Sequence, residues 1–255
     1  MPVPAAAADT TGRRVARARF VLGVDGCRAG WAAVHLNLYD NDVTGAVTGF
    51  IAGTFAEVMR ASAAMTVVDM PIGLSDRDAR ACEAMARGVL KPLRHCSVFS
   101  SPRRPMLAFA GYADANAWGK REENGGKGLS KQAWMIAPKI REIDAAIAPS
   151  DQARIGEGHP EVAFARLNCG APCRHAKRKP EGQAERRALL NGAGIENAEE
   201  IYETLRRDAG RGVGRDDVYD ACALALTAKA RLEGSALRLS DDEHDARGLV
   251  MEIWG

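Results

Sequence analysis

Short apolar runs alternate with turn residues over the first seventy positions, a pattern that predicts the strands of a sheet. The run at 19–25 predicts a first strand, and the alternation at 31–38 predicts a second, joined to it through the turn GCRAG. Residues 43–51 predict a third strand, which follows the turn residues YDND. The run at 65–68, which stops before Pro71, predicts a fourth.

Helical periodicity appears between and after these strands. Thr54, with Glu57 three positions later, predicts a capping box at the start of a short helix over 54–63. Ser75 predicts the start of another helix, and Pro138 is expected to break or kink a third. The later helices are predicted over 75–90, 130–147, 196–207 and 215–232. Residues 153–156 predict the start of a fifth strand, and the closing GLVMEIWG predicts an edge strand.

Two of the predicted strands end on an aspartate, Asp25 and Asp69. A helix separates these strands along the chain, and a strand–helix–strand crossover places the two strands parallel with their carboxyl ends at one edge of the sheet. Open α/β sheets build their sites at that edge, so we expect Asp25 and Asp69 to lie close together. Each aspartate also fits a simpler role as a turn residue, because turns favour aspartate.

The predicted helix at 215–232 begins with further acids. Asp217 and Asp220 are three positions apart and share a face of the helix. Acids near a helix N-terminus also interact favourably with the helix dipole. This interaction can explain Asp216 fully. It explains Asp220 less well, because the apolar stretch ACALALTA follows Asp220 directly. Carboxylates that converge repel one another unless cations hold them, and Mg²⁺ or Mn²⁺ suits such oxygen ligands. Two such ions about 4 Å apart promote in-line phosphoryl displacement.

Composition narrows the class of protein. With 255 residues, 46% hydrophobic and 27% charged, the chain has the composition of a soluble globular protein. No apolar run approaches the roughly 20 residues of a membrane span, so we expect a cytoplasmic protein that contacts no membrane. The formal charge is only +2, so any charge signal is local. The basic segments 87–104 and 174–187 fit contacts with a phosphate backbone, although such runs are also common on solvated surfaces.

A set of ordered motifs resembles one bacterial and archaeal domain-of-unknown-function family. The motifs are GVDGCRAGW, VVDMPIGL, SVFSSPRR, GLSKQAW, KIREID, EGHPEVAF, RDDVYDA and MEIWG, and the resemblance covers about residues 20–255. The family is described as predicted nucleases of the ribonuclease H fold. DDVYDACALALTA is also similar to the terminal acidic helix of Holliday-junction resolvases.

The resemblance implies an α/β, ribonuclease-H-like fold, in which three antiparallel strands and then parallel strands form a central mixed sheet flanked by helices. We expect a flexible tail at 1–18 and a single domain at 19–255, with helical and loop insertions at about 75–150 and 165–212. The sequence does not indicate an oligomeric state.

The resemblance also implies roles for individual acids. Asp25 matches the first-strand metal ligand and Asp69 the acid at the end of the fourth strand, while Asp217 and Asp220 match the late-helix acids. The expected metal ligands are Asp25, Asp69, Asp217 and Glu157, and the expected catalytic residues are Asp25, Asp69, Asp217, Asp220 and Glu161. Glu161 equally suits a helix start, because it follows Pro160. His159 could act as a proton shuttle or be structural.

We therefore expect a Mg²⁺- or Mn²⁺-dependent nuclease or phosphodiesterase that acts on DNA or RNA. One alternative is a small-molecule phosphotransferase or nucleotide-binding protein of the actin and sugar-kinase superfold. Such proteins normally carry two copies of the domain, and this chain has little room for both. A second alternative is a non-catalytic nucleic-acid-binding module, which the intact acids argue against. The glycine-rich loop 123–128 lacks the Gly-Lys-Ser/Thr ending of a P-loop. Cys169, Cys173 and His175 lack the second ligand pair of a structural zinc site.

Overall fold

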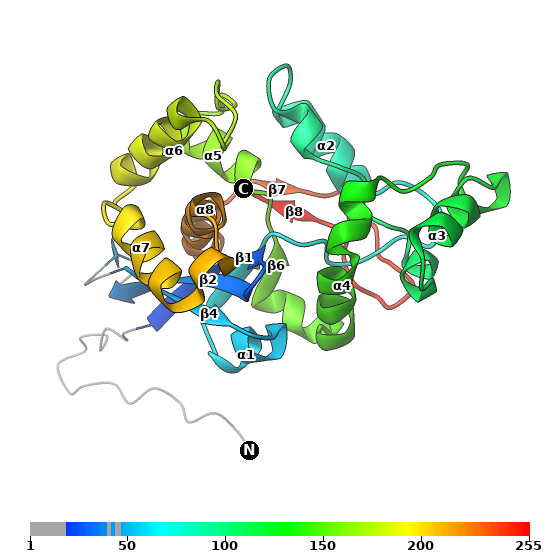
Figure 1. Cartoon of the computed structure of the whole chain (residues 1–255), viewed down its shortest axis with the longest axis horizontal. Coiled ribbons are helices and arrows are strands. Elements are labelled where there is room, and N and C mark those ends of the chain that lie inside the picture. The colour runs from blue at the N-terminus through cyan, green and yellow to red at the C-terminus, as the bar shows by residue number, and fades with distance from the viewer. Residues whose placement is uncertain (1–18, 40–41, 44–46) are drawn as a thin grey trace.

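The computed structural model describes residues 19–39, 42–43 and 47–255, and its main sheet is mixed (Figure 1). The strand order is β3-β2-β1-β5-β6, and β4 pairs with the same edge of β2 as β3 does. β1 pairs antiparallel with β2 and parallel with β5, which pairs parallel with β6. The strands are β1 Arg19–Cys27, β2 Gly30–Tyr39, β3 Asp42–Val43, β4 Thr48–Ala52, β5 Met65–Val68 and β6 Ile155–Glu157.

The predicted α/β sheet is confirmed, with one change. The expected third strand, 43–51, is divided into β3 and β4, and residues 44–46 between them lie outside the described residues. The tail expected at 1–18 also lies outside them.

Helices cover both faces of the sheet (Figure 1). Because successive side chains of a strand point to opposite faces, β1 contributes side chains to the cores on both sides. Val21 packs in a core cluster with the later helices, whereas Leu22 and Val24 pack in a second cluster with the earlier ones. The later helices are α5 Pro160–Leu167, α6 Pro180–Gly192, α7 Ala198–Ala209 and α8 Arg215–Leu232, and the earlier ones are α1 Phe55–Arg60 and α4 Lys131–Ala146. Of the helices that the structure describes, none is long and apolar enough to cross a membrane.

Helix α8 has the predicted bounds, and it lies against β1 at Gly23. A Cβ atom at Gly23 would lie 2.0 Å from the carbonyl oxygen of Ala221, so only glycine allows this approach. The close approach brings the first turns of α8 to the carboxyl end of β1, where Asp25 lies.

Two predicted helix starts were wrong in detail. Thr54 is the N-cap of α1, but its side chain accepts no capping hydrogen bond; Glu57 instead accepts one from the backbone N–H of Gly53, at 2.8 Å. Ser75 does not start a helix, because its Oγ accepts from the backbone N–H groups of Arg77 and Asp78 and forms a turn. The helix α2 begins later and spans Ala81–Val89.

Other segments differ from the expected pattern. α4 continues through Pro138 without a break. α3 Tyr112–Gly119 and α6 lie within the two expected helical and loop insertions, and α5 begins at Pro160, where Glu161 suits a helix start. α5 and α6 each begin with a proline, which suits the first helical position. The expected C-terminal edge strand is β8 Ile253–Trp254, which pairs with β7 Arg238–Leu239 in a separate small sheet.

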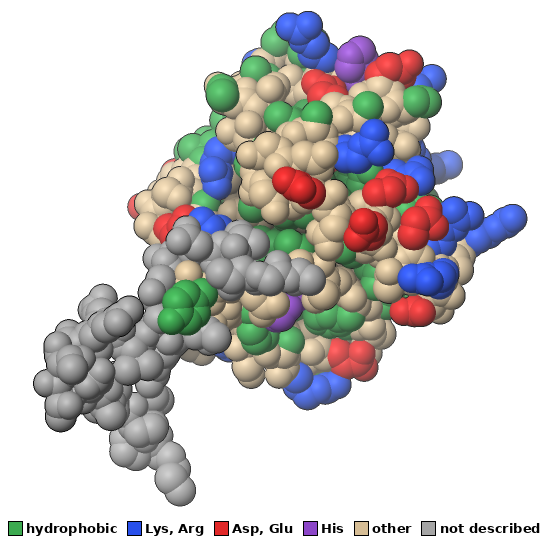
Figure 2. All heavy atoms as spheres, turned by 90° about the vertical axis from the view of Figure 1, so that its left-hand side faces the viewer, with side chains coloured by type: hydrophobic (Ala, Val, Ile, Leu, Met, Phe, Trp, Pro, Cys, Tyr) green, Lys and Arg blue, Asp and Glu red, His purple; other side chains and the backbone are tan. Residues whose placement is uncertain are grey.

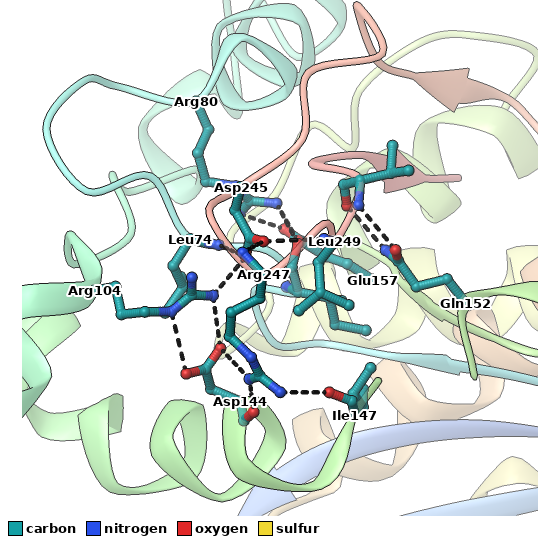
Figure 3. A network of polar contacts seen from close by, with 12 residues as sticks. Leu74, Arg80, Arg104, Asp144, Ile147, Gln152, Glu157, Asp245, Arg247 and Leu249 are labelled. Carbon is teal, nitrogen blue, oxygen red and sulfur yellow. Dashed lines mark hydrogen bonds and ion pairs between the residues drawn. The ribbon is translucent and has the colours of Figure 1, made fainter. Parts of the chain in front are cut away.

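Ion pairs join α4 to the C-terminal segment (Figure 3). Arg104 contacts Asp144 of α4 at 2.9 Å and Asp245 at 2.5 Å, and Arg247 contacts Asp144 at 3.1 Å. The side chain of Asp245 also accepts from the backbone N–H of Leu74. These contacts hold the segment after β5 and the C-terminal segment against α4.

Candidate functional site

Three aspartates from separate elements converge at the carboxyl ends of the parallel strands. Asp25 is a buried residue near the carboxyl end of β1, Asp69 directly follows β5, and Asp220 lies in α8. One carboxylate oxygen from each lies within 4.8 Å of the other two. The backbone N–H of Asp69 donates to the carbonyl of Val24 at 2.9 Å, which extends the parallel pairing to this point. We call Asp25, Asp69 and Asp220 the aspartate cluster.

Burial and mutual repulsion make this cluster costly without a cation. Asp25 is 5% exposed and Asp220 1% exposed. Burial, together with the charges of Asp69 and Asp220, raises the pKa of Asp25 well above its ordinary value. Burial also raises the pKa of Asp69 to about 7. Within the described residues, Oδ1 of Asp220 is buried and has no hydrogen-bond partner, whereas Oδ1 of Asp25 accepts from the backbone N–H of Gly26 at 2.6 Å.

Lys177 supplies a positive charge to the aspartate cluster. Its Nζ lies 2.5 Å from Oδ2 of Asp220, and the charge of Asp220 raises the pKa of the ammonium above its ordinary value. Sequence reasoning placed Lys177 only within the basic segment 174–187. No sequence pattern could have paired it with Asp220, 43 positions away.

Asp217 lies beside the aspartate cluster but is not part of it. Its Oδ2 accepts from the backbone N–H of Gly214 at 2.8 Å, which caps the start of α8. Burial raises the pKa of Asp217 to about 6. Asp220, which was expected to be catalytic but not a metal ligand, is therefore the late-helix acid that meets the strand acids. The assignment of Asp217 as a metal ligand stays a prediction.

Glu157 ends β6, where its carboxylate forms a buried ion pair with Arg80 (Figure 3). Nη1 of Arg80 donates to Oε1 at 3.1 Å, Nη2 donates to Oε2, and the backbone N–H of Ile72 donates to Oε2 at 2.8 Å. These donors account for the burial of Glu157 without a metal ion. Its predicted role as a metal ligand stays a prediction.

Glu161 and His159 stand at the start of α5. Oε1 of Glu161 lies 2.5 Å from Nη2 of the buried Arg186, while Oε2 has no hydrogen-bond partner in the described part of the chain. Burial raises the pKa of the carboxyl. His159 precedes the helix as its N-cap, and burial lowers its pKa to about 4, so its imidazole is neutral at pH 7. Its Nδ1 is buried and has no hydrogen-bond partner among the residues that the structure describes.

One cavity of about 320 Å³, which we call the acidic cavity, is lined by the aspartate cluster and by Lys177, Asp217, Glu157, His159 and Glu161. A second hollow, of about 780 Å³, shares Gly26, Ile136, Arg178, Asp216 and Asp217 with it. The cationic side chains that line this second hollow are Arg28, Lys139, Arg178 and Arg211. They outnumber its three acids, Glu142, Asp216 and Asp217, by one, and we call it the basic groove.

Ion pairs inside the protein involve many cations of the two predicted basic segments. Arg87 pairs with Glu83, Arg104 with Asp144 and Asp245, Arg186 with Glu161, Lys177 with Asp220 and Arg178 with Asp216. By contrast, Arg28 and Arg211 of the basic groove are exposed and form no ion pair within the described part of the chain. Sequence reasoning missed this groove, because its cations come from separate short segments.

Comparison with known proteins assigns the chain to a family. Searches of curated proteins and of solved structures found no match. A family model described as a protein of unknown function, DUF429, matches residues 23–245. This range contains the aspartate cluster and Lys177. The chain therefore belongs to the DUF429 family.

Proposed function

We propose that the protein is a divalent-metal-dependent phosphodiesterase that cleaves nucleic acid on a ribonuclease-H-like fold. The observation that carries this proposal is the aspartate cluster, in which two buried carboxylates, from β1 and α8, and a half-buried one, from the end of β5, meet within 4.8 Å. Acids in a fold are seldom buried together unless a cation compensates them.

The residues present fit Mg²⁺ or Mn²⁺. Both ions prefer oxygen ligands, and the unpartnered, buried Oδ1 of Asp220 is a free acceptor beside two further carboxylates. Asp25, Asp69 and Asp220 would hold the ion, with Asp217 next to them. A bound ion of this kind supplies activation of water and stabilisation of the leaving oxygen. Among the described residues, Lys177 supplies positive charge to these carboxylates through its ion pair with Asp220.

The strand arrangement supports the finer fold assignment. Three antiparallel strands precede two parallel ones, in the order β4-β2-β1-β5-β6, which is the order expected of a ribonuclease-H-like sheet. The acids lie on the first strand, at the end of the next parallel strand and on the last long helix. These are the positions that the motif resemblance implies.

The basic groove supports nucleic acid as the substrate. Its cations lie next to the acidic cavity, with Asp216, Asp217 and Arg178 lining both. A strand whose backbone follows the groove would bring its phosphates toward the aspartate cluster. On the face that Figure 2 shows, by contrast, acidic and basic side chains are interspersed, so this face offers no continuous basic surface.

A cleavage assay tests the proposal. Single strands, duplexes, RNA–DNA hybrids and four-way junctions are incubated with Mn²⁺ or Mg²⁺ and with wild type, Asp25→Asn or Asp208→Asn. Asp208 is an exposed aspartate of α7 that lines neither hollow, and it serves as the matched control. We expect Asp25→Asn to lower the cleavage rate at least a hundredfold and Asp208→Asn to leave it unchanged.

Two results would contradict the proposal. One is cleavage that persists in Asp25→Asn, and the other is no cleavage of any substrate by the folded wild-type protein with either ion. In the second case, an ATP-dependent rise in the melting temperature would favour the phosphotransferase alternative.

A further inference from the structure

A third cavity, of about 660 Å³, adjoins the acidic cavity but has the opposite charge. The two cavities share Val98, Phe99 and Ser101 as lining residues, so the segment 98–101 forms a wall between them. The charged residues that line the third cavity are Arg77, Asp78, Arg87, Arg103 and Lys127. Four cations thus face a single acid.

Arg103 is the buried cation of this cavity, with 8% of its surface exposed. Its guanidinium donates to the backbone carbonyls of Arg77 at 3.3 Å, Gly119 at 3.2 Å and Lys127. Its Nε has no hydrogen-bond partner, and no acid of the described residues forms an ion pair with it. Carbonyl dipoles orient the guanidinium, and the charge of Asp78 compensates it only in part, without an ion pair; a buried charge that is not fully compensated is costly.

Glycines allow the surrounding loops to close on Arg103. A Cβ atom at Gly119 would lie 2.5 Å from Nη2 of Arg103, and one at Gly125 would lie 2.6 Å from Nη1. Gly125 also has a positive φ of 93°, which few other residues adopt. The glycine-rich loop 123–128, which matches no P-loop, therefore has a structural purpose: it encloses this guanidinium.

The remaining cations at this cavity differ in how far they are compensated. Arg87 is paired with Glu83 at 3.3 Å. Arg77 and Lys127 are exposed, and neither forms an ion pair with any acid that the structure describes. α4 begins at the cavity lining, after Leu129 and Ser130, and its N-terminus adds partial positive charge. With Arg87 left out because it is paired, the lining carries three positive charges and one negative charge, so its net charge is +2. The charges belong to Arg77, Arg103, Lys127 and Asp78.

We infer that this third cavity binds a phosphate monoester group, with Arg103 as the buried charge and Arg77 and Lys127 as the outer contacts. The volume is that of a small-ligand pocket and accommodates a mononucleotide. The phosphate has two sources with the same chemistry: a free mononucleotide, or the 5′-phosphate of a nucleic-acid strand that continues toward the acidic cavity. The inference does not depend on metal binding or on cleavage.

Calorimetric titration in EDTA tests the inference, because EDTA removes any contribution from the aspartate cluster. The ligands are inorganic phosphate, AMP, adenosine, and a trinucleotide with a 5′-phosphate or a 5′-hydroxyl. We expect AMP to bind and adenosine not to bind. Tighter binding of the 5′-phosphorylated trinucleotide than of AMP identifies a strand end as the ligand, and the reverse order identifies a mononucleotide.

Substitution at the cavity mouth locates the site without disturbing Arg103. Lys127→Gln and Arg77→Gln are each expected to weaken AMP binding roughly tenfold, because each removes one charge-assisted contact. Arg207→Gln, an exposed arginine of α7 that does not line the cavity, is the matched control and should bind as wild type does. The inference is overturned if no phosphorylated ligand binds, or if binding in the Arg77→Gln, Lys127→Gln double variant equals that of wild type while the melting temperature is unchanged.

Discussion

The ammonium of Lys177 lies 2.5 Å from the carboxylate of Asp220, so a cation of the protein itself contacts the aspartate cluster. The same charge also acts on Asp25 and Asp69 and opposes the rise of their pKa values. A divalent ion that binds these carboxylates must therefore compete with Lys177 or be repelled by it.

Replacing Lys177 by Met should strengthen metal binding. Two like unit charges that lie about 4 Å apart near a protein surface, such as an ammonium and one charge of a metal ion, repel by roughly 4 kcal/mol at an effective dielectric constant of 20. We expect Lys177→Met to bind Mn²⁺ at least tenfold more tightly by calorimetry, and to melt at a lower temperature in EDTA. Lys179→Met, an exposed neighbour, should match wild type in both. Weaker Mn²⁺ binding in Lys177→Met would contradict this prediction and would show that the ammonium of Lys177 favours metal binding.

The metal-free protein should lose stability as the pH rises. Asp69 has a pKa of about 7 in the folded protein against an ordinary value of 3.8, so the folded state holds the proton more tightly than the unfolded state does. The free energy of unfolding therefore falls between about pH 4 and pH 7, by at most about 1.4 kcal/mol per pH unit for this group. Urea unfolding in EDTA at a series of pH values measures this slope. Asp69→Asn should have a shallower slope, and an equal slope in the variant would contradict the assignment.

Gly23→Ala tests the packing that positions Asp220. The added Cβ would lie 2.0 Å from the carbonyl of Ala221, so α8 would have to move away from β1. We expect a loss of about 3 kcal/mol or more in the free energy of unfolding. Gly88→Ala in α2, where a Cβ meets nothing within 4 Å, is the control and should be neutral or stabilising by about 0.5–1 kcal/mol. Equal stability of the two variants would show that α8 does not pack on β1 in this way.

Glu157→Gln separates a structural role from a metal-binding one. The change removes one of the two charges that pair with the buried Arg80 and leaves Glu83, at 3.7 Å, as the other, so unfolding should become easier by about 1–3 kcal/mol. Because the ion pair already accounts for this carboxylate, Mn²⁺ affinity should stay within about twofold of wild type. Glu122→Gln, at an exposed site, is the matched control. A tenfold or larger loss of Mn²⁺ affinity in Glu157→Gln alone would instead support the predicted role of Glu157 as a ligand.

The sequence predicted those features that depend on local pattern. Each of β1, β2 and β5 formed within two residues of its expected bounds, and α8 formed at its expected bounds, because apolar periodicity fixes both the element and its buried face. The parallel pairing of β1 and β5 then brought Asp25 and Asp69 to one edge, as the crossover rule implies.

The sequence did not reveal features that depend on tertiary pairing. Lys177 and Asp220, or Arg80 and Glu157, lie far apart in the chain, and a basic run gives no sign of which cation will be buried. The choice between Asp217 and Asp220 also required the structure, since both share the helix face and only the approach of α8 to Gly23 decides which one reaches the strand acids. The start of α2 was wrong because Ser75 stabilises a turn as readily as a helix cap.

The most direct test of the account is a calorimetric titration of the metal-free protein with Mn²⁺, made on wild type, Asp220→Asn and Asp208→Asn. The account predicts saturable binding by wild type and by Asp208→Asn, and at least a tenfold loss of affinity in Asp220→Asn, because Asp220 belongs to the aspartate cluster and Asp208 does not. No binding by the folded wild-type protein, or equal binding by all three proteins, would contradict the claim that Asp25, Asp69 and Asp220 form a divalent-metal site.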